Sequence, residues 1–350
     1  KDEVLRKFKI FQNQPELKIY NGQTVKIGLW LGYFNRNLFK FFKLNKEQNL
    51  TICDNTRILK LISHEKKIVG LEIQRNQNLN QVFFDHIILT AGAFESNRIL
   101  LESGLIQQEK IYFSDHLSRK VFKVYGERNL ENIDFNFDFI GTSLVTRRLI
   151  GEVDGYSYFA NPVYNSSFPF FQELKKTLFK GELNILQLKK VILDLPQVIK
   201  FIYVLLIKRK LAVYNDEWEI HIDIENPKSN SYIKLGSKER LYNAHSLDVF
   251  FDMDREMIKK IYHTSISEIK ALLIRNNLKF EIISEDYSYE KLEDTYHPFN
   301  MELSDSINLE SFYNKFPSIL VVNTGILPRA GGINVTASLF PIIDDFVQNK

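Results

Sequence analysis

The stretch "FFDHIILTAGAFESNRILLESG", from Phe83 to Gly104, decides how the fold is interpreted. Its first part predicts a strand, because Ile87–Leu89 is apolar, β-rich and bounded by polar residues. Its last part predicts an apolar helix with Gly104 as the C-cap. Between the two, residues 90–93 carry no side chain larger than a hydroxyl and a methyl group. Such a turn lets another group lie against the backbone, although the turn alone favours a tight strand–helix junction without a ligand.

A second unit of the same kind closes the chain. The strand "SILVVNT" leads through the glycine-rich turn "GILPRAGGIN" into the helix "VTASLFPIIDDFV". Two such units around a β-rich block with helices predict an α/β fold, α+β overall, in which a nucleotide-binding lobe is interrupted by a substrate-binding lobe. We expect residues 1–114 and 318–350 to form a partial nucleotide-binding lobe, and 115–317 to form a substrate lobe with a largely antiparallel sheet and helices.

Other segments follow the usual periodicities. Alternating residues predict two strands around the Asn226-Pro227 turn, and helical spacing predicts long helices over 170–212 and 254–278. On the second helix, the apolar residues at helical spacing form a stripe that is interrupted by one polar residue, Ser265. Further strands are expected at Asn49–Cys53, Arg57–Ser63 and Val69–Arg75, with turns at Asp54-Asn55 and Gln77–Asn80.

Composition narrows the function classes. The 350 residues are enough for a large core, and 44% hydrophobic residues are typical of a soluble globular protein. A net charge of +3 is too small to indicate a nucleic-acid or anionic-membrane partner. One cysteine and seven scattered histidines lack the spacing of a zinc site, so no metal is expected. The single cysteine also fits a reducing compartment, and we expect a cytoplasmic location.

The longest apolar stretch is "VIKFIYVLLI", residues 198–207, which is followed by three basic residues. Spanning a bilayer takes about 20 apolar residues, so a transmembrane helix is not expected here. Two interpretations stay open for residues 198–210. A helix packed into the protein is favoured, and a helix that lies on a membrane surface with a basic flank is the alternative.

Five segments, taken in order, resemble the glucose-methanol-choline (GMC) family of flavin oxidoreductases. The similarity covers about residues 46–350, the C-terminal two-thirds of the family pattern. The segments are "NLTICDNTRILKLI" with "VGLEI" and "HIILTAGAFESNRILLESG", then "SDHLSRKV", "NPKSNSYIKLGS", "YHPFNMEL" and "LVVNTGILPRAGGINVTASL".

The resemblance implies FAD as the cofactor and a Rossmann-like FAD-binding lobe. Carried over residue by residue, the family pattern assigns the flavin contacts to Ile58, Thr90, Ala91, Gly92, Asn323, Thr324, Val335 and Thr336. It assigns catalysis to His297 and Asn334. A neutral imidazole can take the proton of an alcohol while hydride leaves for the flavin, whereas an asparagine can only hydrogen-bond the substrate oxygen. The implied substrate is a small-molecule alcohol, with a sugar favoured by the aromatic β-rich block, and the electron acceptor is unidentified.

Several positions depart from the family pattern. No G-x-G-x-x-G loop occurs among the 15 glycines, so we expect the chain to be a fragment that begins downstream of the loop for the FAD phosphates. Asn323, Thr324 and Val335 stand where the family has Asp, Gly and Pro. Asn300 replaces a glycine and Ser304 a methionine.

These departures leave two alternatives to the enzyme. One is a catalytically inactive homologue that serves as a binding or assembly protein. The other is a small-molecule binder without flavin, and a G-x-G-x-x-G upstream of the chain would remove it.

Overall fold

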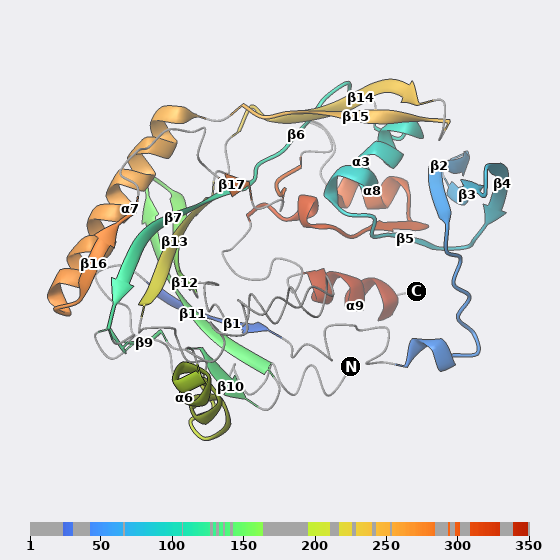
Figure 1. Ribbon diagram of the computed structural model, residues 1–350. Helices are drawn as coiled ribbons and strands as arrows, with labels where there is room; N and C mark the ends of the chain where they lie inside the picture. The colour runs from blue at the N-terminus through green and yellow to red at the C-terminus, as the bar shows by residue number, and fades with distance from the viewer. Residues whose placement is uncertain are drawn as a thin grey trace, which may run out of the picture. The chain divides into compact units, whose positions relative to one another are not determined.

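The architecture is known from a computed structural model of the chain (Figure 1). It describes residues 24–30, 43–65, 67–106, 108–126, 129–130, 133–135, 137–140, 143–163, 195–210, 217–225, 229–239, 243–252, 254–283, 293–294, 298–301, 309–329 and 339–348. These residues form helices and mostly antiparallel sheets, which confirms the predicted mixed α/β class. The chain divides into two compact units. Unit 1 comprises Lys1–Glu47, Ser118–Asp223 and Lys259–Leu292, and unit 2 comprises Gln48–Leu117, Ile224–Ile258 and Glu293–Lys350.

Unit 1 is built on one large sheet. Its strands follow the order β1 (Thr24–Trp30), β11 (Ser143–Val153), β12 (Tyr156–Val163), β13 (Glu217–Glu225), β7 (His116–Tyr125) and β16 (Lys279–Ile282). β1, β12 and β10 (Asp138–Ile140) each pair antiparallel with β11, and β16 pairs antiparallel with β7. Unit 1 also holds the short strands β8 (Asn129–Leu130) and β9 (Ile133–Asp134), the 3-10 turn η2 (Leu44–Lys46) and the helix α6 (Leu195–Leu206), whereas β17 (Glu293–Asp294) falls within unit 2.

The helix α7 (Arg255–Arg275) packs on this sheet, as its stripe predicts. Its apolar positions at helical spacing are all buried: Ile258, Ile261, Tyr262, Ile269, Leu272 and Leu273. The polar gap at Ser265 is also buried, and its hydroxyl donates to the Tyr262 carbonyl oxygen at 2.9 Å. The Tyr262 hydroxyl donates in turn to the Ile222 carbonyl oxygen of β13 at 3.1 Å.

Unit 2 contains the first quoted stretch. Strands β2 (Thr56–His64), β3 (Lys67–Arg75) and β4 (Asn78–Phe83) form an antiparallel meander. β5 (Ile87–Leu89) runs parallel to β18 (Ile319–Val321), and α3 (Ala93–Glu102) follows β5. A third sheet has the order β15 (Ala244–Phe250), β14 (Tyr232–Glu239) and β6 (Ile111–Tyr112). The unit also holds α8 (Leu309–Lys315), the 3-10 turn η5 (Thr324–Ile326) and α9 (Phe340–Gln348).

The core of unit 2 joins segments that are far apart in the chain. Its buried residues come from β5, α3, β6, α8 and β18, and they include Leu89, Leu100, Ile111, Phe312 and Ile319. β14 and β15 pack on α3, and His245 of β15 contacts the Glu102 carboxylate of α3 through its Nδ1 at 2.8 Å.

Two local predictions are wrong. Residues 49–53 form no strand, and all five are exposed, so no neighbouring segment completes their backbone hydrogen bonds. The turn expected at Gln77–Asn80 lies at Asn76 and Gln77, which both take positive φ angles, and a strand resumes at Asn78. The two strands expected on either side of Asn226-Pro227 are present as β13 and β14, and they belong to different sheets.

The predicted lobe boundaries also differ from the two compact units. Residues 224–258 and 293–317 belong to unit 2 because β14 and β15 pack on α3, and because α8 contributes to the same core. Residues 1–47 belong to unit 1, where β1 pairs with β11. The division into a cofactor lobe and a substrate lobe stays a prediction.

Candidate functional site

The site begins where the two parallel strands of unit 2 end. The register pairs Leu89 with Val321, and the Val322 amide donates to the Leu89 carbonyl oxygen at 2.9 Å. Thr90 and Asn323 therefore follow neighbouring strand ends. Ligands of open parallel sheets bind outside the carboxyl ends of the strands, so this edge is the candidate flavin site.

The turn after β5 has an open surface. Thr90, Ala91 and Gly92 are all exposed. Gly92, the N-cap of α3, has φ 87° and ψ 167°, and a Cβ placed on it would meet no atom within 4 Å. No side chain caps this end of α3. A helix N-terminus whose amides lack a cap, beside exposed small residues, suits a nucleotide that lies against the backbone. These residues therefore fit FAD.

Arg98 fastens α3 to the meander beneath this turn. Its guanidinium is 1% exposed and donates through Nη2 to the Ile58 carbonyl oxygen at 2.9 Å and to the Glu95 carboxylate at 2.7 Å. The backbone of Ile58 thus helps to position α3. The half-buried Ile58 side chain packs against the core of unit 2, and its contact with the adenine stays a prediction.

Asn323 shapes the turn after β18. Its Oδ1 accepts from the Gly325 amide at 2.8 Å, which caps η5. The side chain is 4% exposed, and its Nδ2 has no hydrogen-bond partner among the described residues. Thr324 donates from its hydroxyl to the Pro298 carbonyl oxygen at 2.7 Å. The first role of both residues is therefore to hold the backbone at the strand end.

The predicted catalytic pair lies outside the described residues, as do Val335 and Thr336. The segment that follows His297 is described, and it lies against the end of β18. The Met301 amide donates to the Gly325 carbonyl oxygen at 2.8 Å, and the Asn300 amide donates to the Leu327 carbonyl oxygen at 2.7 Å. The chain on the C-terminal side of His297 is thus held beside the candidate flavin site. The roles of His297 and Asn334 stay predictions.

One departure from the family pattern has a structural explanation. Asn300, which replaces a glycine, has φ 51°. Asparagine adopts this left-handed conformation more readily than other residues with a side chain. A left-handed backbone of the kind that glycine adopts easily is therefore possible here with asparagine.

Sequence reasoning missed the Asp115–His116 pair. Both residues are buried, and His116 Nδ1 lies 3.2 Å from the Asp115 carboxylate. The imidazole also packs edge-on against Phe299, with ring centroids 6.2 Å apart, next to the segment that follows His297. Histidine spacing alone gave no indication of this pair, but the Asp-His dipeptide in the second family segment is a signal that could have found it.

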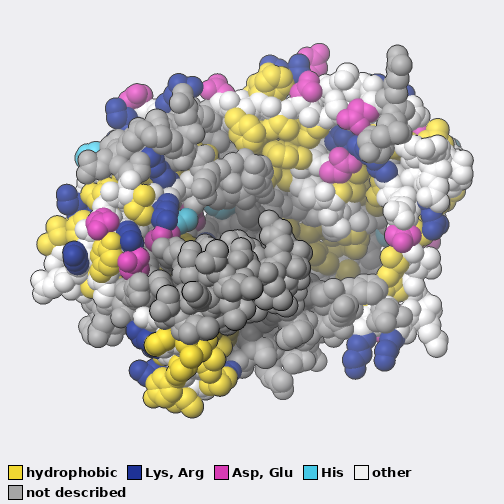
Figure 2. Space-filling model, in the orientation of Figure 1, with side chains coloured by type: hydrophobic (Ala, Val, Ile, Leu, Met, Phe, Trp, Pro, Cys, Tyr) yellow, Lys and Arg dark blue, Asp and Glu magenta, His cyan; other side chains and the backbone are white. Residues whose placement is uncertain are grey.

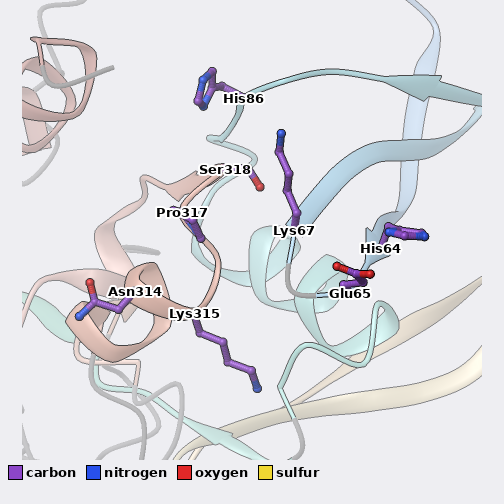
Figure 3. Close-up of a pocket in the computed structure, with 8 residues that line it drawn as sticks. All are labelled: His64, Glu65, Lys67, His86, Asn314, Lys315, Pro317 and Ser318. Atoms are coloured by element: carbon purple, nitrogen blue, oxygen red, sulfur yellow. The ribbon is translucent and has the colours of Figure 1, made fainter.

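A separate hollow of about 410 Å³ opens at the other end of the same two strands (Figure 3). His86 precedes β5 and Ser318 precedes β18, so both lie at the amino ends. The remaining lining residues are His64, Glu65, Lys67, Asn314, Lys315 and Pro317. This hollow does not belong to the candidate flavin site. Among the described residues, no cluster of three or more His, Cys, Asp or Glu could hold a metal ion.

Comparisons with known proteins agree with this geometry. Residues 37–144 match a family model described as GMC oxidoreductase. Over these residues the chain is similar to the GMC oxidoreductases. The predicted resemblance is confirmed, and the match includes β5, the small turn and all of α3. No curated protein matches the sequence significantly.

Two solved structures share the fold. Pyridoxine 4-oxidase from Mesorbium loti has a TM-score of 0.50 and 14% identity, and the similarity covers 88% of this chain and 59% of that chain. An FAD-dependent oxidoreductase from Chaetomium thermophilum has a TM-score of 0.50 and 10% identity, with coverages of 90% and 64%. The protein thus spans less than two thirds of the length of either structure. At these identities the likeness shows the fold alone, and the family match supports FAD as the cofactor.

Proposed function

We propose that this protein acts in the FAD-dependent oxidation of a small-molecule alcohol. The match of residues 37–144 to the GMC oxidoreductases carries the proposal. The exposed turn Thr90–Gly92 at the end of β5, beside the end of β18, supports it. Bound there, FAD would accept hydride from the carbinol carbon of the substrate.

The residues of this chain would supply the binding and the proton transfer. Thr90, Ala91 and Gly92 would offer their backbone to the cofactor, and Asn323 and Thr324 would hold the neighbouring strand end in shape. His297 is the proposed base for the substrate hydroxyl, because a neutral imidazole accepts a proton near pH 7. Asn334 is proposed to donate a hydrogen bond to the same oxygen. A sugar is the proposed substrate, since aromatic faces stack well on pyranose rings.

The first prediction tests this assignment through His297. In the flavin-loaded protein, His297→Ala should slow reduction of the flavin by about a hundredfold or more, which is the usual contribution of a positioned base. Asn334→Ala should cost less, because it removes a hydrogen bond and leaves the proton acceptor. Bleaching of the flavin absorbance after rapid mixing with a panel of sugars and alcohols measures both effects. His64→Ala, an exposed histidine of unit 2, is the matched control and should bleach at the parental rate.

Two outcomes would contradict the proposal. If His297→Ala bleaches as fast as the parent, His297 is not the base. If the parent binds FAD but no compound of the panel bleaches the flavin, the protein is better interpreted as a catalytically inactive homologue than as an enzyme.

A further inference from the structure

The helix α6 of unit 1 presents an apolar stripe to its exterior. Five large residues within it are about half exposed or more: Leu195, Ile199, Ile202, Tyr203 and Leu206. Positions 195, 199, 202 and 206 follow one another by three or four residues, and Tyr203 lies beside Ile202, so the five share one broad face of the helix. Ile207, at 67% exposure, continues the same stripe. Figure 2 shows these side chains as a contiguous hydrophobic area over α6.

The opposite face of α6 accounts for its packing. Val198 is buried at 8% exposure, and Phe201 and Leu205, three and seven positions later, are half-buried. The helix is therefore apolar on both faces, but only one face is covered. Six neighbouring exposed apolar side chains on one short helix are typical of an interaction surface.

The end of α6 is fastened to the sheet. The Phe139 amide of β10 donates to the Arg209 carbonyl oxygen at 2.7 Å, and Lys210 pairs with Asp138 at 3.8 Å. Arg209 has φ 53° and ends the helix in the left-handed conformation. The apolar stripe is thus held in a fixed orientation relative to β10.

The charges within residues 195–210 are all of one sign, although Asp194 directly precedes the helix and Lys210 pairs with Asp138. Residues 195–210 contain Lys200, Lys208, Arg209 and Lys210 and no acidic residue. Lys200, Lys208 and Arg209 are exposed. Anionic lipid headgroups complement such a cluster, and an apolar face beside basic residues is the pattern of helices that lie in a membrane interface.

We propose that α6 docks this protein on the surface of an anionic phospholipid membrane. The stripe from Leu195 to Ile207 enters the boundary between headgroups and acyl chains, and the basic residues contact the lipid phosphates. The helix lies in the plane of the membrane. In the described part of the chain, no helix is long and apolar enough to cross a bilayer.

Vesicle co-sedimentation of the whole protein tests this proposal. The probes are vesicles of phosphatidylcholine alone and vesicles with one quarter phosphatidylserine. The parent should bind the anionic vesicles. Ile199→Asp/Leu206→Asp should weaken this binding by about tenfold or more, because two charges then face the acyl chains. Leu79→Asp/Phe83→Asp is the matched control, since it makes the same change at two exposed apolar residues of β4 and should leave binding within about twofold.

A milder variant covers the case in which the double mutant does not fold. Lys208→Gln/Arg209→Gln alters only exposed side chains, and it should reduce binding to anionic vesicles severalfold while the circular dichroism spectrum stays parental. As a direct reading of insertion, Tyr203→Trp should gain fluorescence that brominated lipids quench.

The proposal is overturned if the parent stays in the supernatant with anionic vesicles. It is equally overturned if Ile199→Asp/Leu206→Asp and the control Leu79→Asp/Phe83→Asp weaken binding to the same extent. It is also overturned if the parent is a dimer by light scattering and Ile199→Asp/Leu206→Asp makes it a monomer, because the stripe would then bind a second copy. Burial of Tyr203→Trp from aqueous quencher without vesicles would show that the chain itself covers the stripe.

Discussion

At the scale of single residues, two backbone conformations explain which amino acids the site requires. Gly92 lies in a region of positive φ with extended ψ that is almost restricted to glycine, whereas Asn300 lies in the left-handed region that asparagine tolerates. At position 300, where the family has glycine, asparagine is therefore a suitable replacement. At position 92 we expect that no residue other than glycine fits without strain.

Gly92 provides a prediction at this scale. Gly92→Asn should lower the free energy of unfolding by about 1–3 kcal/mol, because the cost comes from the backbone and not from a clash. Gly104→Asn is the matched control, since Gly104 has φ 66° and open space around it, and it should cost less than about 1 kcal/mol. Urea unfolding measures both. Equal costs at the two positions would contradict the explanation.

At the scale of elements, one hydroxyl connects the meander to the parallel strands. Ser318, 3% exposed and next to β18, accepts from the Ile68 amide at 3.0 Å and donates to the Ile68 carbonyl oxygen at 2.8 Å. The side chain satisfies two buried backbone groups of β3 at once. It therefore replaces a pair of ladder hydrogen bonds between strands that belong to different sheets.

Removal of this hydroxyl gives the second stability prediction. Ser318→Ala should lower the free energy of unfolding by about 2–4 kcal/mol, because each buried group left without a partner costs about 1–3 kcal/mol. Ser267→Ala removes an exposed hydroxyl that bonds the His263 carbonyl oxygen of α7, and it should cost about 0.5 kcal/mol or less. If chemical denaturation finds no difference between the two variants, another group or water satisfies Ile68.

The helix α8 provides a pH-dependent prediction. Burial raises the pKa of Tyr313 to about 12 from its ordinary value of 10.0, and its hydroxyl donates to the Val321 carbonyl oxygen. Because the pKa is raised in the folded state, the stabilisation is complete below pH 10 and is lost as pH rises from 10 to 12. Relative to Tyr313→Phe, the parent should lose about 2 kcal/mol over that window. Urea titrations at successive pH values measure the difference, and parallel curves for the two proteins would contradict it.

At the scale of the whole molecule, unit 2 gathers three separate chain segments around the candidate flavin site. β5 and β18 pair although most of the chain lies between them, and β14 and β15, which come from that intervening part, pack on α3. FAD bound at the strand ends would therefore contact segments that meet only in the folded protein.

Hydrogen exchange tests this arrangement without any measurement of activity. FAD at a hundred times its Kd stabilises a folded protein by about 2.7 kcal/mol, which corresponds to roughly a hundredfold slower exchange where opening requires release of the ligand. We expect this protection in residues 90–102 and 319–327 together. β11 of unit 1 should change less and is the internal control. Protection of only one of the two segments would contradict the proposed cofactor site.

The sequence by itself determined the features that depend on local periodicity and composition. The strand–turn–helix unit around Gly92, the buried stripe of α7 and the family resemblance all follow from residues close together in the chain. The strand expected at Asn49–Cys53 fails, and β4 was missed, because a strand needs a partner edge that sequence periodicity does not reveal.

Only the tertiary structure decided which segments meet. The parallel pairing of β5 with β18, the separation of β13 and β14 into different sheets and the exposure of one face of α6 depend on contacts between distant residues. An apolar residue has the same preference for burial wherever it stands, so the sequence of α6 cannot tell its covered face from its open one. The physical reason is that burial is a property of the packed neighbours, and these are chosen by the free energy of the whole fold.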